Sequence, residues 1–433
     1  MNGRRRVVVT GLGVVSPLGH EVETLWRGLA AGSSAIGPIR HFDAAGFPTR
    51  IAAESSDPER PEATAPALWQ QLSRIERFAF AAANAALADA GLERRARSAA
   101  RHGDPRFGLA LAAGLGSFSH AEVFAPCAAA ATGAGGFDEE RFAAALAGAL
   151  GPRAAERRSP GNLAARLADE LGLAGPLLSV DTACAAGTQA VGDAARWVRL
   201  GLADAVVAVA SDSQLSPLGL ASFCLLRVLS TRNDDPARAS RPFAAGRDGF
   251  VMGEGAGALV LESLAAAERR GAPIYAEVAG FGSACDAYRV TDPHPEGLGA
   301  ALAMQRALAD AGVEPAAVGY INAHGTSTPA NDRLETRAIH RVFAAAATPP
   351  ASSTKSMIGH LTVAAGAVEA IATIGMLREQ RLHPTLNLDE RDPDCDLDYV
   401  AGGARPASLE LALSNSFGFG GQCASLVLRR WNA

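Results

Sequence analysis

The 433-residue sequence lacks the features that mark secreted, membrane-spanning or nucleic-acid-binding proteins. Its six cysteines are scattered with no C-x-x-C pair, which argues against a disulfide framework or a zinc site and favours a reducing cytosol. No basic run or stripe is present and the net charge is −5, so nucleic acid is not an expected partner. Apolar runs are of strand length or broken by glycine and charge, so we expect neither a membrane span nor a signal peptide.

What the chain does contain is an alternation of strand-like and helical segments. This alternation predicts α/β layers, and 433 residues suit two domains or one duplicated domain. A new set of elements begins near Pro273 and repeats the strand–helix–strand order of the first part, which suggests an internal duplication. The stretch from Phe124 to Pro160 is rich in Ala and Gly, and its low complexity predicts an insertion of loose structure.

One cysteine stands in a segment with the pattern of a helix start, VDTACAAGTQAV. Asp181 and Thr182 are common capping residues, and the residues that follow favour helix. Cys184 is therefore predicted in the first helical turn, where free N–H groups and the helix dipole stabilise a thiolate and lower the pKa of the thiol. The residues alone also fit an inert buried cysteine, the commonest fate of this residue type.

A histidine ends a second apolar strand, in GYINAHGTSTPANDRLE. The strand predicted over Val318–Asn322 delivers His324 into a loop of glycine and hydroxyl residues that includes Thr326 and Thr328. Hydrogen-bonding groups crowded beside a histidine at a strand end are typical of a ligand-facing loop. A structural histidine followed by an ordinary turn and the helix cap before Asp332 fits the same residues.

Lys355 and His360 share the loop in SSTKSMIGHLTVAAGAVEA. The helix predicted over Val363–Leu377 is apolar on all sides except at Glu369 and Thr373, and such a helix is buried. A buried carboxylate needs a partner, and Lys355 is the nearest candidate in sequence. A Lys355–Glu369 pair would order the loop that presents His360, whereas the alternative makes Lys355 an ordinary surface lysine.

Three glycines surround Phe419 in SNSFGFGGQCAS. Glycine permits close backbone approach and unusual dihedral angles, and a backbone N–H in such a loop can serve an oxyanion hole. A plain hairpin between the last two strands fits the pattern equally well.

The order of these motifs, DTACAAG, NAHGTST, STKSMIGH and NSFGFGG, resembles that of the β-ketoacyl-ACP synthases, and the elongating type II members most closely. The resemblance covers nearly the whole chain and includes VVVTGLGVVSPLG at the start and the segment Leu229–Gly257. It implies the thiolase-like α/β fold, in which two duplicated halves stack in five αβαβα layers. The halves would be residues 1–270, with the nucleophile and the insertion at about 124–160, and residues 271–433, with the His/Lys/His loops.

The resemblance implies an acyltransferase, a ketosynthase that joins an acyl chain to malonyl-ACP by decarboxylative Claisen condensation. The pathway would be fatty-acid or type II polyketide biosynthesis. Cys184 would carry the acyl group, and His324 and His360 would bind the malonyl thioester oxygen and stabilise the enolate left by CO2. The N–H groups of Cys184 and Phe419 would hold the second oxyanion.

Further site residues are assigned by the same resemblance. Lys355 corresponds to a structural and electrostatic lysine, and Glu335 and Glu369 to its buried supporting acids. The others contact the substrate or its carrier: Thr326 and Thr328 hold the phosphopantetheine arm, Phe223 lines the acyl pocket, Phe419, Asp286 and Thr291 form the gate, and Arg74, Arg77 and Arg227 meet the acidic carrier protein. The substrates arrive on the phosphopantetheine of ACP, so no cofactor and no catalytic metal are implied. Some members of the family bind a structural monovalent cation, which the sequence leaves open.

The chain departs from the family pattern at three places. Gln422-Cys423 stands where Thr-Asn is usual, Arg289 where His is common, and Thr362-Val363 where Leu-Gly is usual. These departures leave the acyl chain length, its saturation and the carrier protein open, and they suggest a dedicated polyketide or specialised fatty-acyl pathway.

Three other assignments share the fold. The family implies a homodimer, but the chain could instead be the active subunit of a heterodimer with a chain-length-factor partner. A non-catalytic chain-length partner would lack the nucleophile, and Cys184, His324 and His360 argue against it. A CoA thiolase would use a second cysteine as acid and base, whereas Phe419 fills the late position here.

Overall fold

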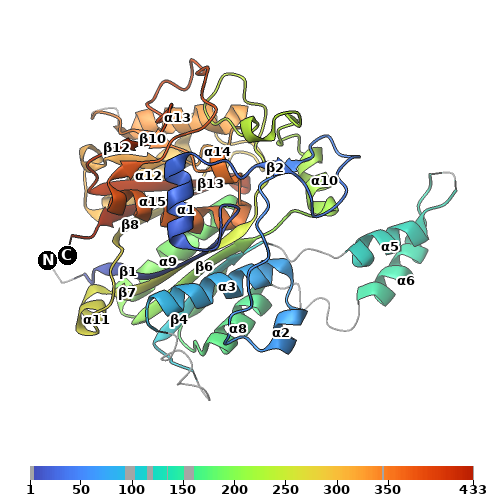
Figure 1. Ribbon diagram of the computed structural model, residues 1–433, viewed down its shortest axis with the longest axis horizontal. Helices are drawn as coiled ribbons and strands as arrows, with labels where there is room; N and C mark the ends of the chain where they lie inside the picture. The colour runs from blue at the N-terminus through green and yellow to red at the C-terminus, as the bar shows by residue number, and fades with distance from the viewer. Residues whose placement is uncertain are drawn as a thin grey trace.

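A computed structural model describes residues 4–92, 103–114, 120–133, 135–150, 160–343 and 346–432 of the chain. Its centre is a mixed sheet of ten strands in the order β10-β9-β13-β14-β8-β1-β7-β6-β4-β5 (Figure 1). The strands of the N-terminal half are β1 (Val7–Val15), β4 (Phe107–Ala113), β5 (Leu177–Val180), β6 (Ala205–Asp212) and β7 (Gly255–Ser263). Those of the C-terminal half are β8 (Ala276–Cys285), β9 (Tyr320–Asn322), β10 (Ala351–Ser352), β13 (Leu411–Gly418) and β14 (Gln422–Arg430).

The two halves use the same strand arrangement. In the order β1-β7-β6-β4-β5, the first two pairings are antiparallel and the last two are parallel. In the order β8-β14-β13-β9-β10, the pairings follow the same sequence of directions. A short antiparallel pairing of β1 with β8 joins the halves. The internal duplication suggested by the sequence is therefore visible in the strand order.

Two helices lie between the halves of the sheet. These are α9 (Ala186–Leu200) and α15 (Ala365–Glu379), each of which contacts strands of both halves. Helices α3 (Arg74–Asp89) and α8 (Pro160–Leu171) cover the outer face of the first half, and α12 (Leu298–Ala311) and α13 (Pro329–Phe343) lie on the second half (Figure 1). This is the five-layer α/β arrangement expected from the resemblance.

The central helices approach each other closely because glycine stands at their contact. A Cβ on Gly187 of α9 would lie 2.8 Å from the carbonyl oxygen of Val363, and a Cβ on Gly366 of α15 would lie 2.4 Å from the backbone nitrogen of Thr188. Both distances are too short for a real contact, so a side chain at either position would push the helices apart.

Each central helix follows a turn of the same shape. The turns are 3₁₀ segments, Ala183–Ala185 before α9 and Thr362–Ala364 before α15. Their first residues have left-handed φ angles of 49° and 47°, which non-glycine residues rarely adopt. The sequences DTACAAG and HLTVAAG align over this stretch, so the backbone position of Cys184 in one half is that of Val363 in the other.

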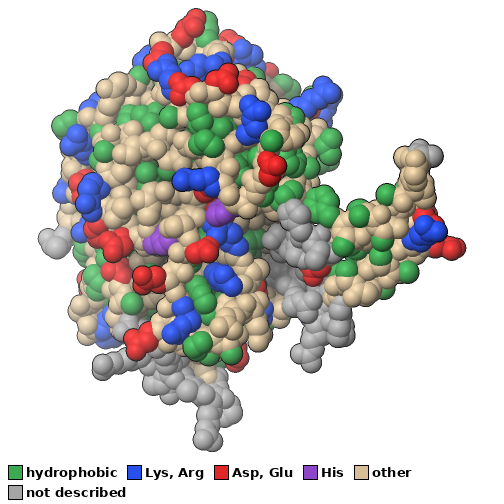
Figure 2. Space-filling model, turned by 45° about the vertical axis from the view of Figure 1, so that its right-hand side comes forward, with side chains coloured by type: hydrophobic (Ala, Val, Ile, Leu, Met, Phe, Trp, Pro, Cys, Tyr) green, Lys and Arg blue, Asp and Glu red, His purple; other side chains and the backbone are tan. Residues whose placement is uncertain are grey.

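The expectation of loose structure between Phe124 and Pro160 is wrong for the described residues. They form helices α5 (His120–Ala130) and α6 (Glu139–Leu150), which stand away from the body of the molecule (Figure 1). Figure 2 shows hydrophobic side chains along this projecting pair, and α6 contains no buried residue. Alanine, which dominates the stretch, has the highest helix propensity of all residues, and this accounts for the helices.

The remaining elements are short or peripheral: α1 (Val22–Ala31), β2 (Gly37–Pro38), β3 (Ile51–Ala52), α2 (Pro66–Gln71), α10 (Pro217–Leu225), α11 (Leu264–Arg269), α14 (Lys355–Ile358), β11 (Arg381–Leu382) and β12 (Arg405–Pro406). Among the described residues, no helix combines the length and the apolar character needed to cross a bilayer.

Candidate active site

Cys184 occupies the 3₁₀ turn that connects β5 to α9. Thr182 is the N-cap residue of this turn, as predicted, but its side chain makes no capping hydrogen bond, and α9 itself begins only at Ala186. The left-handed Ala183 turns the chain sharply just before the cysteine. Cys184 thereby lines a cavity of about 340 Å³.

The cavity collects residues from both halves of the molecule. Cys184 and Phe223 reach it from the N-terminal half, and His324, His360 and Phe419 reach it from the C-terminal half. Phe223 packs edge-on against Phe250 with ring centroids 5.7 Å apart, and the ring of Phe250 in turn meets His360 at 5.1 Å. The predicted site residues thus converge although they lie far apart in the sequence.

The rings of His324 and His360 pack edge to face, with centroids 5.3 Å apart and planes at 83°. Glu335 on α13 fixes the loop of His324, because its carboxylate accepts the backbone N–H groups of His324 and Gly325 at 2.8 Å each. The N–H of Thr362 donates to Nδ1 of His360 at 3.2 Å, so the proton of this neutral imidazole resides on Nε2.

Lys355 forms an ion pair with Glu369 in which both side chains are 1% exposed. The hydroxyl of Thr354 donates to the same carboxylate at 3.1 Å, and the hydroxyl of Ser240 donates to the carbonyl oxygen of Lys355 at 2.8 Å. The surface-lysine alternative is therefore excluded. Lys355 is also the one lysine in the whole sequence, a signal that sequence reasoning overlooked.

Burial dominates the electrostatics of the site. It raises the pKa of the Cys184 thiol to about 12, against the lowering effect of the nearby Lys355 charge. The expectation of a lowered thiol pKa is therefore wrong for the resting site, because loss of hydration outweighs the lysine charge and the backbone hydrogen bond, which both lower the pKa. Burial and the Lys355 charge together hold the pKa values of His324 and His360 well below their usual range. At neutral pH the site contains a thiol and two neutral imidazoles.

Two loops close one side of the cavity and are bonded to each other. The N–H of Gly420, next to Phe419, donates to the carbonyl of Val290 at 2.6 Å, and the N–H of Asp286 donates to the carbonyl of Gly421 at 2.8 Å. The Asp286 carboxylate also accepts the backbone N–H of Gly299, in the first turn of α12, at 2.7 Å and that of His294, in its own loop, at 3.0 Å. Thr291 follows Val290 and lines the cavity. The proposed gate residues therefore belong to one connected unit.

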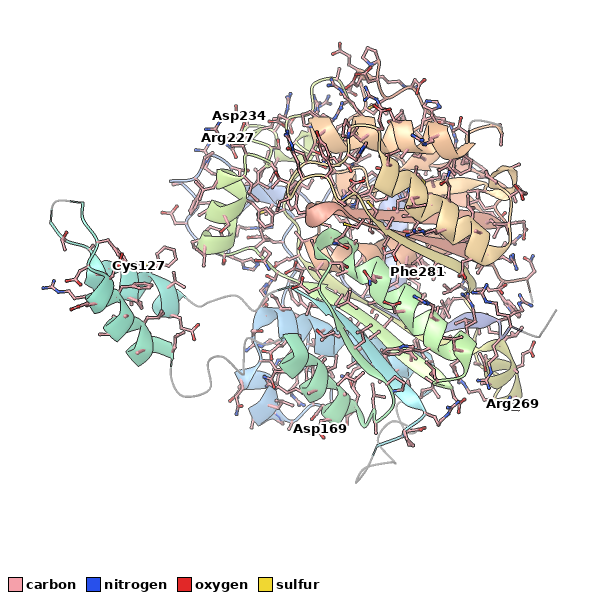
Figure 3. All side chains as sticks on the ribbon, turned by 180° about the vertical axis from the view of Figure 1, so that it is seen from behind. Cys127, Asp169, Arg227, Asp234, Arg269 and Phe281 are labelled. Atoms are coloured by element: carbon pink, nitrogen blue, oxygen red, sulfur yellow. The ribbon has the colours of Figure 1, made fainter. Side chains whose placement is uncertain are left out.

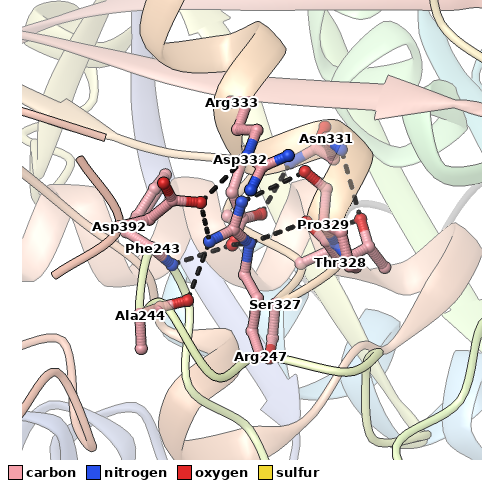
Figure 4. Close-up of polar contacts among 12 residues, drawn as sticks. Phe243, Ala244, Arg247, Ser327, Thr328, Pro329, Asn331, Asp332, Arg333 and Asp392 are labelled. Atoms are coloured by element: carbon pink, nitrogen blue, oxygen red, sulfur yellow. Dashed lines mark hydrogen bonds and ion pairs between the residues drawn. The ribbon is translucent and has the colours of Figure 1, made fainter. Parts of the chain in front are cut away.

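The loop of Thr326 and Thr328 rests on a buried arginine that sequence reasoning missed (Figure 4). The two threonine hydroxyls lie 2.9 Å apart and line the cavity. Arg247, with a side chain 1% exposed, donates to the carbonyl oxygens of Thr328 and Pro329 at 3.1 Å each and to the carboxylate of Asp392 at 2.8 Å. Its position in FAAGRDGF, beside two glycines, marked it only as part of a loop.

The predicted carrier-contacting arginines differ in what they touch. Arg74 is drawn inward, because its guanidinium pairs with the buried Glu254 at 2.7 Å and also binds Asp57. Arg77 lies over the ring of Trp69 and donates to its carbonyl oxygen at 3.3 Å. Arg227 is exposed at the rim of the cavity, beside α10 (Figure 3). Of the three, Arg227 is best placed to meet a partner at the cavity mouth.

Two family models match this chain. Residues 4–267 match the beta-ketoacyl synthase N-terminal domain, and residues 275–389 match the beta-ketoacyl synthase C-terminal domain. The chain belongs to the beta-ketoacyl synthase family. As a ketosynthase it is an acyltransferase-type enzyme, and the reaction class read from the sequence is confirmed.

Relatives match the ketosynthase over its full length. The 3-oxoacyl-[acyl-carrier-protein] synthase 2 of Coxiella burnetii is 44% identical over 99% of both chains, and that of Vibrio cholerae is 43% identical over 99% of both. Among solved structures, a beta-ketoacyl synthase from Burkholderia phymatum matches with a TM-score of 0.87 and 35% identity, covering 99% of this chain and all of that one. A type II polyketide ketosynthase solved with its acyl-carrier protein and a hexaketide matches with a TM-score of 0.84 and 34% identity, covering 99% of this chain and 100% of that one.

Proposed function

We propose that this ketosynthase elongates acyl chains on acyl carrier protein through an acyl-enzyme at Cys184. The observation that carries the proposal is the convergence of one cysteine and two neutral histidines on a single cavity. In the first step the sulfur of Cys184 attacks the acyl thioester, and the carrier sulfur leaves with the thiol proton. The N–H groups of Cys184 and Phe419 are the proposed donors to the later oxyanion, which forms when the enolate attacks the acyl carbonyl on Cys184.

The second step is decarboxylation of malonyl-ACP. The thioester oxygen accepts hydrogen bonds from the imidazoles of His324 and His360, which are neutral and buried, so each contributes an N–H without a fixed positive charge. The bond between the α-carbon and the carboxylate breaks, and CO2 departs. The electron pair of that bond stays on the thioester and forms the enolate. The enolate carbon then attacks the acyl carbonyl on Cys184, a carbon–carbon bond forms, and the cysteine sulfur leaves.

The supporting residues hold this arrangement. Lys355 neutralises Glu369 and lowers the pKa values of the thiol and both histidines, so it favours the reactive form of each. Thr326 and Thr328 are the proposed contacts of the phosphopantetheine arm. Their loop is held by Arg247, which bonds to backbone carbonyls that no rotamer change can withdraw.

Carrier docking and dimerisation complete the proposal. Exposed Arg227 at the cavity rim suits an acidic carrier protein, and such charges raise the rate of encounter more than the affinity. Helix α6 has no buried residue, and Phe137 beside it is 54% exposed, so this pair of helices suits burial against a second copy. A homodimer is our first choice, and a heterodimer with a chain-length-factor homologue is the second. A solved neighbour with 35% identity is itself a ketosynthase/chain length factor.

A structural monovalent cation fits a group of buried oxygen atoms. The side-chain amide of Asn322, the hydroxyl of Ser414 and Oε2 of Glu369 are buried with no hydrogen-bond partner. Asn322 and Ser414 are register partners on β9 and β13, and α15, which carries Glu369, packs against β13. Such hard oxygen donors suit an alkali ion. The free cysteines, including the required thiol, fit the cytosol.

Intact-mass spectrometry tests the proposed function. The protein is mixed with a panel of acyl-ACPs of different chain length and then with malonyl-ACP. We expect an acyl adduct on Cys184 followed by a carrier product two carbons longer. No adduct with any chain, alone or with a homologous partner subunit present, would overturn the proposal.

A further inference from the structure

A carboxylate outside the roles assigned so far reaches the turn that follows His360. Asp212 is the last residue of β6 and is 1% exposed. Its Oδ2 accepts the hydroxyl of Thr362 and, at 3.2 Å, the backbone N–H of Val363, while Oδ1 accepts the side-chain amide of Gln214 at 2.9 Å. A Cβ on Gly114 would lie 2.0 Å from Oδ1, so glycine at that position leaves the carboxylate its space.

The duplicated fold gives this contact a counterpart in the other half. Strand β6 corresponds to β13, so Asp212 corresponds to Gly418, the last residue of β13. The turn beside Asp212 contains Val363, and the turn beside Gly418 contains Cys184. A Cβ on Gly418 would lie 2.9 Å from the nitrogen of Cys184. In one half the strand end therefore carries no side chain beside the N–H of Cys184, and in the other half a carboxylate accepts the equivalent N–H of Val363.

The contact matters because of what lies between its two donors. The hydroxyl of Thr362 and the N–H of Val363 are both bound to Asp212, and the N–H of Thr362 is the donor to Nδ1 of His360. Thr362 holds a left-handed φ of 47°, which needs support from its surroundings. Leucine is usual at this position in the family pattern, and leucine has no hydroxyl to bind Asp212.

We propose that Asp212 is a positioning residue for His360, acting through the turn 360–363. The carboxylate holds Thr362 in its left-handed conformation, so that the N–H of Thr362 faces Nδ1 and the Nε2 proton of His360 faces the malonyl thioester. The proposal rests on the proposed function, in which His360 serves decarboxylation.

The Asp212 carboxylate supports His360 but has an unfavourable effect on Cys184. Its negative charge raises the pKa of the thiol and so disfavours the thiolate. Burial raises the pKa of Asp212 itself, and the donors from Thr362, Gln214 and Val363 oppose that rise. Removal of the charge should therefore damage one partial reaction and assist the other, which a merely structural residue would not do.

The Asp212→Asn variant tests this separation. Conversion of malonyl-ACP to acetyl-ACP without an acyl primer reports decarboxylation, and alkylation of Cys184 by iodoacetamide at fixed pH reports the thiolate. We expect decarboxylation to fall about 10- to 100-fold, since a small misplacement of a reacting group has an effect of this size. Alkylation should stay equal or become faster.

Two further variants keep the test decisive. Gln214→Met removes a donor from Asp212 without touching the turn, and both rates should stay within about threefold of the parent. Thr362→Val removes only the hydroxyl and should lower decarboxylation selectively, even if Asp212→Asn does not fold. Equal loss of decarboxylation and alkylation, or an unchanged decarboxylation rate in Asp212→Asn, would overturn the proposal. If the parent enzyme itself fails to decarboxylate malonyl-ACP, the proposed function fails instead.

Discussion

The two halves of the molecule share a backbone and differ in chemistry. Each has five strands in the same order and directions, a 3₁₀ turn with a left-handed first residue, and a central helix of 15 residues. At equivalent positions of the turn stand Cys184 and Val363, and three residues earlier stand Asp181 and His360. The proposed nucleophile thus belongs to one copy and the proposed catalytic imidazole of the turn to the other. Because the two halves have the same backbone architecture, a few side chains determine how their chemistry differs.

The largest expected effect concerns Cys184 and Val363, which occupy equivalent positions in the two turns. Cys184→Ala should abolish condensation, with kcat/KM lower by at least about 10⁴-fold, because the acyl-enzyme cannot form. Val363→Ala, at the same backbone position of the other half, should stay within about tenfold. Steady-state condensation assays on both variants measure the difference. Product formation by Cys184→Ala would refute the mechanism.

The next comparison is between His360 and Asp181. His360→Ala should lower malonyl decarboxylation about 10²- to 10³-fold and hurt acyl loading less, because it removes a donor to the enolate oxygen. Asp181→Ala, an exposed residue, should change either rate by less than about threefold. Equal loss of both steps in His360→Ala would contradict this division of labour.

The lowered histidine pKa values add a pH test of the parent enzyme. A histidine whose pKa is lowered stays neutral until the pH falls below its usual titration range. Decarboxylation should therefore remain level from pH 8 to pH 6, within about twofold, where an ordinary histidine would already become protonated. A half-maximal loss near pH 6.5 would show that a histidine with an ordinary pKa controls the step.

The C-terminal half also contains a buried ion pair, formed by Lys355 and Glu369. Lys355→Met leaves Glu369 as an unpaired buried charge and should lower the free energy of unfolding by about 3–5 kcal/mol. The double variant Lys355→Met/Glu369→Gln should recover part of the loss. Chemical denaturation followed by fluorescence measures both. A single variant as stable as the parent would mean that Glu369 is protonated in the folded state.

The smallest expected effect concerns the contact between the two central helices, to which each half contributes one helix. Gly187→Ala and Gly366→Ala each place a methyl group between the central helices and should lower stability by about 1–3 kcal/mol. Gly148→Ala, on α6 with open space around it, should raise stability or leave it unchanged. If the two central variants differ by more than about 2 kcal/mol, the halves do not share this contact equally.

Much of this structure could be predicted from local pattern. The buried central helix was predicted because the stretch Val363–Leu377 is apolar on nearly all sides, and the Lys355–Glu369 pair because a buried carboxylate needs a cation. The thiol pKa was predicted in the wrong direction, since burial depends on long-range packing that a local motif does not reveal. Asp212 and Arg247 were missed for the same reason: each acts on a segment more than 80 residues away. The repeat of DTACAAG as HLTVAAG was available in the sequence and would have paired the two turns.

The single lysine has a consequence for an enzyme that works among acyl thioesters. Thioesters transfer acyl groups to free amines without catalysis, and exposed lysines are the usual acceptors on a protein surface. Here the one lysine side chain is 1% exposed and bound to Glu369, and the other basic side chains that carry a permanent charge are arginines, which do not react in this way. The folded protein therefore has no exposed lysine that its acyl-thioester substrates could acylate. No lysine competes with Cys184 for the acyl group.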